Sequence, residues 1–158
     1  MNSNDKILIL DFGSQYTQLI ARRVREIGVF SEVKPSSIST EEIIKMNPSG
    51  IILSGGPETV TISSSQKVHK SLLEAKIPIL GICYGMQTIA KELGGSVVNS
   101  DVREFGHAEI SHVNKSVLFD SVNFDSNNLD VWMSHGDKVD KIPENFEIIA
   151  SSKDCGVA

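Results

Sequence analysis

Apolar runs alternate with amphipathic stretches over the first part of the chain. The runs at 6–11, 50–53 and 77–82 show no polar alternation, which is typical of parallel strands buried on both faces. A further short strand is expected at 30–34, before Pro35. Helical spacing is found in the stretches 15–27, 39–46, 65–75 and 84–93. This order of strands and helices predicts an α/β fold with a mostly parallel sheet flanked by helices.

Three of these helices have sequence features that predict their orientation or ends. In 15–27 the apolar stripe expected to face the core comprises Leu19, Ile20, Val24 and Ile27. In 65–75 the expected inward residues are Val68, Leu72, Leu73 and Ala75. Ser39 and Glu42 have capping-box spacing and mark a helix start.

The pattern changes after Gly95, where short apolar segments are separated by turns. They predict an added antiparallel or mixed region with strands at 96–98, 105–113, 116–119, 129–133 and 146–150. The chain contains no repeat and no linker-like tract, so we expect residues 1–158 to be a single domain.

A cysteine stands at the turn between the third apolar run and the helix that follows it. Gly81, Cys83 and Gly85 form the thiol version of the G-x-S-x-G nucleophile elbow, in which flanking glycines relieve crowding around a strained residue. The helix N-terminus behind the sulfur favours a thiolate. The alternative is a buried, inert cysteine in a strand-to-helix turn.

Donors for an oxyanion can be proposed from two loops at the carboxyl edge of the sheet. The Tyr84 N–H follows the nucleophile, and Gly55-Gly56 follows the neighbouring strand without side chains in the way. The loops 11–13, 54–57 and 83–85 should therefore converge on one crevice. The segment 54–57 could instead be only a tight turn, and it is not a P-loop, because Pro57 has no N–H and no lysine follows.

Composition narrows the class of protein. A net charge of −5 without a basic run argues against a nucleic-acid or anionic membrane partner. No stretch has the length of a membrane span, and the N-terminus lacks a signal-peptide core. Cys83 and Cys155 are far apart and match no disulfide or metal pattern. We expect a cytoplasmic protein with no metal site.

Several segments together resemble a known family. Gly81-Ile82-Cys83-Tyr84-Gly85-Met86-Gln87 is similar to the nucleophile motif of class I, triad-type glutamine amidotransferases. Four further segments, over nearly the whole chain, resemble one branch of that family, whose ammonia aminates xanthosine monophosphate. They are 11–23, 54–58, 103–106 and 131–137. The resemblance implies a flavodoxin-like amidotransferase fold.

The resemblance also implies roles for individual residues. Cys83 would attack L-glutamine and form a glutamyl thioester, with the Gly56 and Tyr84 amides as the oxyanion hole. Gln87 and the 134–136 loop, with Ser134 and His135, would line the glutamine pocket. The 11–17 loop would lie near a domain interface. ATP and Mg²⁺ would bind a separate ATP-pyrophosphatase domain, no cofactor is expected in this one, and a homodimer of the full-length enzyme is compatible with the family.

The family's base and its orienting carboxylate lie in a late His-Pro-Glu segment that does not occur in these residues. We therefore expect the domain to be incomplete at its C-terminus, where Ala158 falls in an expected strand, and to have little glutaminase activity. His135, with Asp137 two residues on, imitates a triad but would contact substrate in the family. His69 is expected on a helix away from the crevice. His107 and His112 have no evident orienting partner.

Two other functions remain open. The first is an amidotransferase of another pathway, such as anthranilate or carbamoyl phosphate synthesis, against which the segments 11–23 and 131–137 argue. The second is a non-catalytic regulatory module that has lost the base. The sequence that follows residue 158 in the natural protein would decide between them.

Overall fold

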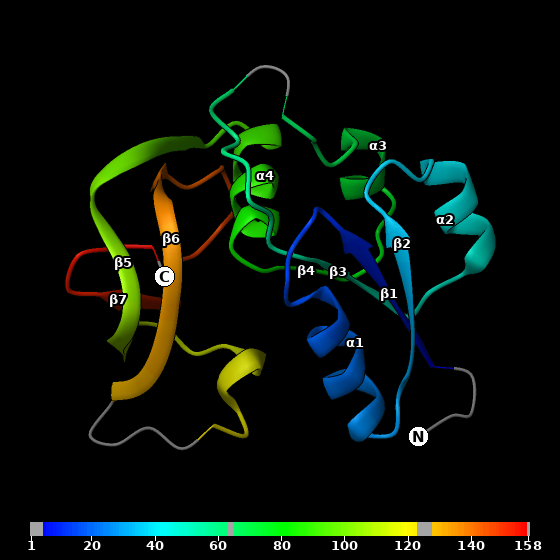
Figure 1. Ribbon diagram of the computed structural model, residues 1–158, viewed down its shortest axis with the longest axis horizontal. Coiled ribbons are helices and arrows are strands. Elements are labelled where there is room, and N and C mark those ends of the chain that lie inside the picture. Colours follow the sequence, from blue (N-terminus) through cyan, green and yellow to red (C-terminus); the bar gives the residue numbers. More distant parts are fainter. Residues whose placement is uncertain (1–4, 63–64, 123–127, 158) are drawn as a thin grey trace. The chain divides into compact units, whose positions relative to one another are not determined.

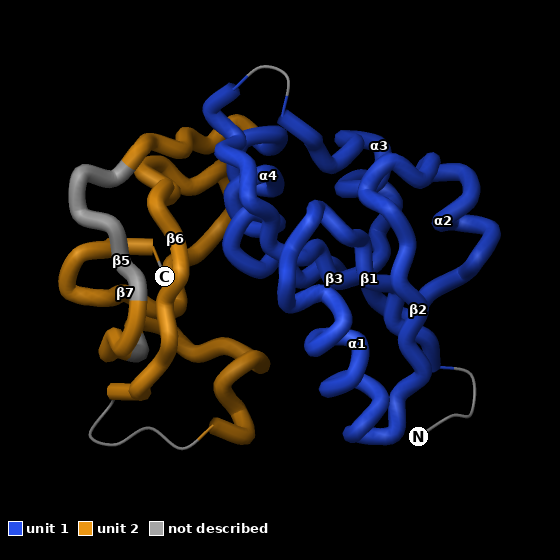
Figure 2. Tube along the Cα trace, in the orientation of Figure 1, with its two compact units in different colours: residues 1–93 blue, residues 94–158 orange. Residues whose placement is uncertain are grey.

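The computed structural model describes residues 5–62, 65–122 and 128–157, with the backbone alone at 100–105 and 112. The polar residues 1–4 and Ala158, with the strand expected there, lie outside this range. The chain divides into two compact units, residues 1–93 and 94–158 (Figure 2). Each unit is described by itself.

The first unit is built on a parallel sheet, as predicted. Its strands are β1 (Lys6–Asp11), β2 (Phe30–Pro35), β3 (Gly50–Leu53) and β4 (Ile79–Gly81). They are arranged in the order β2-β1-β3-β4 (Figure 1). The apolar runs of β1 and β3 account for the core, since Leu8, Ile9 and Leu10 of β1 and Leu53 of β3 are buried. The prediction that the run 77–82 is buried on both faces is wrong, because β4 is last in the strand order and Leu80 is 39% exposed. Their carboxyl ends meet at one edge, where ligands of open α/β sheets bind.

Helices flank this sheet. They are α1 (Thr17–Glu26), α2 (Thr40–Met46), α3 (Lys70–Leu73) and α4 (Tyr84–Glu92). Helix α1 packs on β1 and β2, and α4 packs on β3 and β4. The capping box of α2 is confirmed, because Ser39 Oγ accepts from the Glu42 N–H and the Glu42 carboxylate accepts from the Ser39 N–H. Helix α4 ends at Glu92, one residue before the predicted end, with Leu93 as its C-cap and Gly94 at φ +92° after it.

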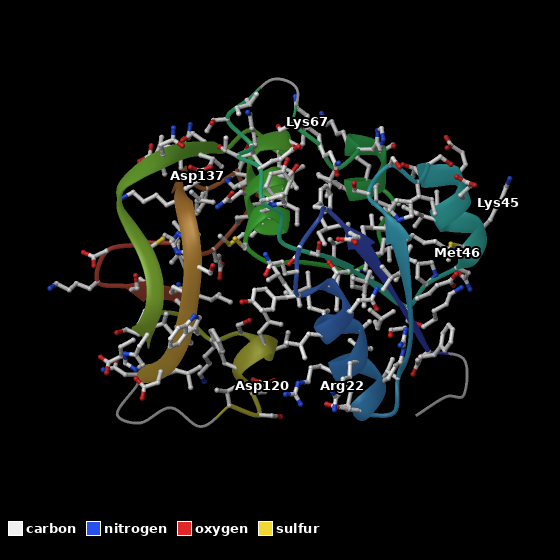
Figure 3. The ribbon with its side chains drawn as sticks, viewed as in Figure 1. Arg22, Lys45, Met46, Lys67, Asp120 and Asp137 are labelled. Carbon is white, nitrogen blue, oxygen red and sulfur yellow. The ribbon has the colours of Figure 1, made fainter. Side chains whose placement is uncertain are left out.

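The predicted apolar stripe of α1 is wrong in part. Leu19 and Ile27 are 44% and 67% exposed, whereas the small residues Thr17 and Ala21 are buried. Ser31 of β2 donates through Oγ to the Ala21 carbonyl over 3.0 Å. This close approach of helix and strand requires small side chains on the inner face. The outer face carries Arg22, which with Arg23 pairs with Glu26 (Figure 3).

The predicted helix 65–75 is also wrong, because among the described residues of that stretch only Lys70–Leu73 is helical. Residues 63 and 64, just before it, are not described. The backbone N–H of Val68 donates to Thr88 Oγ1 over 3.2 Å, and the Gln66 carbonyl accepts from the Tyr84 hydroxyl. These tertiary bonds replace the helical ones. Val68 and Leu72 are nevertheless buried, as their apolar character predicts. His69, expected on the helix, stands just before it at the N-cap position with an extended backbone and no side-chain capping bond.

The second unit is an antiparallel sheet of β5 (Ser96–His112), β6 (Asn128–Lys141) and β7 (Ala150–Ser152), in the order β6-β5-β7. The predicted strands 96–98 and 105–113 are therefore one strand with two register shifts, and 129–133 belongs to a longer one. The predicted strand 116–119 is wrong. Val117–Phe119 forms a 3₁₀ turn, η1, in which Ser116 Oγ accepts from the Leu118 N–H. The predicted strand 146–150 is wrong except at its last residue, because 146–149 is not extended into a strand and β7 begins at Ala150.

Candidate active site

Cys83 occupies the sharp turn between β4 and α4, and it adopts φ 52° and ψ −109°. Non-glycine residues rarely adopt positive φ, and such a conformation costs about 1–3 kcal/mol. Cys83 is half-buried. The strained conformation predicted for a nucleophile elbow is therefore confirmed at the backbone level.

The two flanking glycines are required by close backbone contacts. A Cβ at Gly81 would lie 2.6 Å from the Met86 nitrogen, and a Cβ at Gly85 would overlap the Leu53 carbonyl oxygen. The Ile82 N–H donates to the same Leu53 carbonyl over 3.0 Å. The turn is thus pressed against the end of β3, and no larger residue fits at either position.

The Gly55-Gly56 loop lies beside this turn. A Cβ built at Gly55 would lie 3.7 Å from the Cys83 Cβ. One at Gly56 would lie 2.7 Å from the Phe12 carbonyl oxygen and 3.4 Å from Tyr84 Cγ. The three loops predicted to converge at the sheet edge do so within the first unit.

Ser54 fixes the start of this loop. It is fully buried, and its Oγ accepts from the Phe12 N–H over 3.0 Å and donates to the Gly55 carbonyl over 2.8 Å. Its own N–H donates to the Leu10 carbonyl over 3.0 Å. One serine therefore ties the ends of β1 and β3 together and orients the peptide bond that precedes Gly56. This role is not evident from the sequence, because a serine in a glycine-rich loop has no distinctive pattern.

Tyr84 follows the candidate nucleophile and is 2% exposed. Its ring packs on Phe12 with centroids 5.4 Å apart, and its hydroxyl donates to the Gln66 carbonyl. Burial raises the pKa of the Tyr84 hydroxyl above its ordinary value, a nearby Glu58 charge adds to this, and a bond to Ser65 opposes it. The Tyr84 side chain is thus a buried anchor and not a solvent-exposed group.

The sequence comparisons bear on the whole chain. The family model described as glutamine amidotransferase class-I matches residues 8–158. The chain belongs to the class I glutamine amidotransferase family.

Its relatives include longer proteins. The chain is 54% identical over 158 residues to a protein named GMP synthase [glutamine-hydrolyzing] from Pseudomonas entomophila, covering 97% of this chain and 30% of that protein. The corresponding Alteromonas mediterranea protein is 55% identical over 157 residues, with 96% and 30% covered. The chain thus spans about a third of the length of these curated relatives. A solved Thermoplasma acidophilum protein, described as a GMP synthase subunit, is 33% identical with a TM-score of 0.86, covering 97% of this chain and 75% of that chain.

The remaining candidate residues of this amidotransferase domain lie in different units. Gln87 is buried on α4, and its N–H donates to the Cys83 carbonyl over 3.0 Å. Ser134 and His135 belong to the second unit, where they stand on β6 and not in the predicted loop. Ser134 is exposed and His135 half-buried, as expected for neighbours on opposite faces of a strand. Only one of these two side chains can therefore face a pocket on a given side of β6.

His107 has an orienting partner, contrary to the expectation. Its Nε2 lies 2.9 Å from Asp130 Oδ1 on the neighbouring strand, and both side chains are largely exposed. The sequence His107-Ala108-Glu109 also has the His-x-Glu spacing. Glu109, however, accepts from the Asn128 amide over 2.8 Å. Both groups are thus engaged in cross-strand contacts within sheet β6-β5-β7.

Three further observations limit what the described residues can hold. They contain no cluster of three or more His, Cys, Asp or Glu placed to bind a metal ion. No helix within them is sufficiently long and apolar to span a bilayer. A cavity of about 490 Å³ opens at the ends of β1 and β2, but none of Cys83, Gly56 or Tyr84 lines it. Its lining residues are Asp11, Gly13, Val33, Lys34, Pro35, Ser36, Ser37 and Gln66.

Proposed function

We propose that this chain is the glutaminase part of a GMP synthase, and that it hydrolyses L-glutamine to supply ammonia. The observation that carries the proposal is that the Gly55-Gly56 loop lies beside the Cys83 turn, where a Cβ built at Gly55 would lie 3.7 Å from the Cys83 Cβ. The GMP synthases similar to nearly all of this chain support the choice of pathway.

In the proposed reaction the Cys83 thiolate adds to the side-chain amide carbon of glutamine and forms a carbon–sulfur bond. The resulting oxyanion accepts hydrogen bonds from the backbone N–H groups of Gly56 and Tyr84. Removal of one such donor typically costs about 2.7–4 kcal/mol of barrier. Collapse of the intermediate breaks the carbon–nitrogen bond and releases ammonia. Water then cleaves the thioester to glutamate and restores the thiol.

The leaving amine must gain a proton, and water must lose one. The family resemblance gives this task to a His-Pro-Glu segment that is absent from the 158 residues. We propose that the base belongs to a part of the natural protein outside these 158 residues. His135 is proposed to contact substrate. The family resemblance assigns Gln87, Ser134 and His135 to the glutamine pocket, and we keep this assignment as a proposal. Ser134 and His135 are neighbours on β6 whose side chains face opposite sides of the strand, so only one of the two side chains would contact the substrate.

The rest of the reaction is proposed to take place outside these residues. Ammonia would pass to an ATP-pyrophosphatase domain that binds ATP and Mg²⁺ and converts xanthosine monophosphate to GMP. The curated relatives have ample additional length for such a domain, since this chain covers only 30% of them. Residues 1–158 would be most of one amidotransferase domain, and the full enzyme would work in the cytoplasm.

The thiol can be tested directly with a glutamine-like electrophile. A chloroketone analogue of glutamine should label Cys83 in preference to Cys155, as measured by peptide mass spectrometry. Iodoacetamide serves as the reagent without glutamine character, and the Cys83→Ala and Cys155→Ala variants identify each site. Cys155 is 3% exposed, so each rate is compared with that of the unfolded chain. Equal labelling of Cys83 and Cys155 after this normalisation, or no labelling of Cys83, would favour the inert-cysteine alternative.

The pathway needs a second test with the full-length protein. Glutamine, ATP, Mg²⁺ and xanthosine monophosphate should together yield GMP, and the Cys83→Ala variant should make GMP only when free ammonia is added. Transfer of the amide nitrogen to another acceptor would assign the domain to a different amidotransferase. Failure of both the labelling and the transfer would favour a non-catalytic module.

A further inference from the structure

Three side chains of α4 bind the backbone of the segment that follows Gly56. We call the described part of this segment, residues 57–62 and 65–69, the strap. The Tyr84 hydroxyl donates to the Gln66 carbonyl, Thr88 Oγ1 accepts from the Val68 N–H over 3.2 Å, and Lys91 Nζ donates to the Val60 carbonyl. Tyr84, Thr88 and Lys91 are spaced i, i+4 and i+7, so they share one face of the helix.

These bonds hold a segment that has almost no secondary structure of its own. Val60 and Val68 are buried, so the strap packs against the unit as well as bonding to it. Lys67 adds an ion pair with Glu92 at 3.9 Å, near the end of α4 (Figure 3). Backbone groups that are buried without a partner are costly, and the α4 side chains provide partners for one buried and two part-buried backbone groups of the strap.

The position of the strap matters because it begins directly after Gly56. One end of the connection is thus a proposed oxyanion donor, and the helix that holds the strap begins at Tyr84, the other donor. The Tyr84 ring also lies beside two residues of the neighbouring loops, Phe12 and Gly56. It packs on Phe12, and its Cγ would lie 3.4 Å from a Cβ at Gly56.

We infer that the Tyr84 side chain is a positioning residue that sets the distance between the two oxyanion-hole amides. Its ring lies beside Gly56, where a Cβ would stand 3.4 Å from Tyr84 Cγ, and its hydroxyl anchors the strap to α4. Thr88 and Lys91 extend the same anchor along the helix. This inference rests on the proposed glutaminase function, and it concerns a side chain, whereas that function uses only the Tyr84 backbone N–H.

The test is the Tyr84→Phe variant, which keeps the ring packing and removes the hydroxyl. The glutamine chloroketone generates an oxyanion when the Cys83 thiolate adds to its ketone carbon, before chloride leaves. Iodoacetamide reacts by direct displacement of iodide and needs no oxyanion hole. We expect the chloroketone rate constant at saturation to fall about tenfold, as the loss of one hydrogen bond allows, while the iodoacetamide rate stays within about twofold.

Two further variants sharpen the test. Tyr16→Phe removes the hydroxyl of the other tyrosine, which is 59% exposed, and should change neither rate. Thr88→Val, which leaves the Val68 N–H without its acceptor, should reproduce the chloroketone defect in weaker form. Circular dichroism spectra matching the wild type would show that the variants are folded.

An unchanged chloroketone rate in Tyr84→Phe would overturn the inference, as would an equal fall with both reagents, because that indicates a general disturbance of the thiol. These results differ from failure of the proposed function. In that case the wild-type chain itself would show no preference of the chloroketone for Cys83.

Discussion

The Thr17 hydroxyl donates to the Asp11 carboxylate over 2.7 Å, joining the first turn of α1 to the last residue of β1. The same carboxylate oxygen accepts from the Gly13 N–H over 2.9 Å. The loop between β1 and α1 is therefore folded around one oxygen atom. Phe12 lies within that loop; its ring packs on Tyr84, and its carbonyl oxygen would lie 2.7 Å from a Cβ at Gly56. The first loop thus supports the candidate site without contributing a reactive group.

Replacing Thr17 with valine should destabilise the first unit by about 1–2 kcal/mol. The side chain is buried and the change keeps its shape, so the loss of the charge-assisted hydrogen bond dominates. Thr17→Ser restores the hydroxyl and should recover more than half of the lost free energy of unfolding. Urea denaturation monitored by circular dichroism provides the measurement, and identical curves for Val and Ser would contradict the role of the bond.

Gly85→Ala should destabilise the fold by about 1–3 kcal/mol or more, because the added methyl group overlaps the Leu53 carbonyl. Gly156 is the matched control, since a Cβ there meets nothing within 4 Å. Gly156→Ala should leave the midpoint of unfolding nearly unchanged. If the two variants unfolded at the same denaturant concentration, the close approach of the turn to β3 would be refuted.

Ser39→Ala should cost about 1 kcal/mol, because it removes the acceptor for the first-turn N–H of Glu42 at the start of α2. The exposed Ser37, two residues earlier, is outside the capping box and serves as control. Hydrogen exchange of the α2 amides would localise the effect. Exchange that is equally fast in Ser39→Ala and Ser37→Ala would argue against the capping box.

The raised pKa of Tyr84 predicts a specific loss of stability in alkali. The unfolded tyrosine ionises near its ordinary value of about 10, whereas burial keeps the folded one protonated to higher pH. The contribution of Tyr84 to stability is therefore complete below pH 10 and is lost as pH rises through its folded pKa. The free energy of unfolding of the wild type should fall more steeply above pH 10 than that of Tyr84→Phe. Parallel curves would contradict the shift.

Local patterns predicted much of the first unit because the physical causes there are local. The apolar runs of β1 and β3, the capping box of α2 and the glycines around Cys83 each depend on a few neighbouring residues. The helix predicted at 65–75 does not form in full. Side chains of α4 form hydrogen bonds with the backbone groups of Gln66 and Val68, in place of the bonds that a helix would make. These hydrogen bonds link residues about twenty positions apart, so they cannot be predicted from a local sequence pattern.

Local patterns also failed to predict the bounds of the strands in the second unit. Residues 116–119 have the apolar character of a strand, but Ser116 caps a turn with its own side chain. The sequence places Ser134 and His135 in a loop, whereas pairing with β5 extends β6 as far as Lys141. A strand is defined by its partner, so its ends depend on the pairing and not on its own composition.

By itself, the sequence determined that Cys83 would follow an apolar strand and stand in a sharp turn between Gly81 and Gly85, because the close backbone contacts of such a turn leave no room for larger residues. Only the tertiary structure decided what surrounds that turn. It placed Gly56 against the Phe12 carbonyl and the Tyr84 ring, and it bound the strap to α4. The physical reason is range: backbone strain is a property of a few adjacent residues, whereas the position of an oxyanion donor depends on packing between loops that the chain brings together only when it folds.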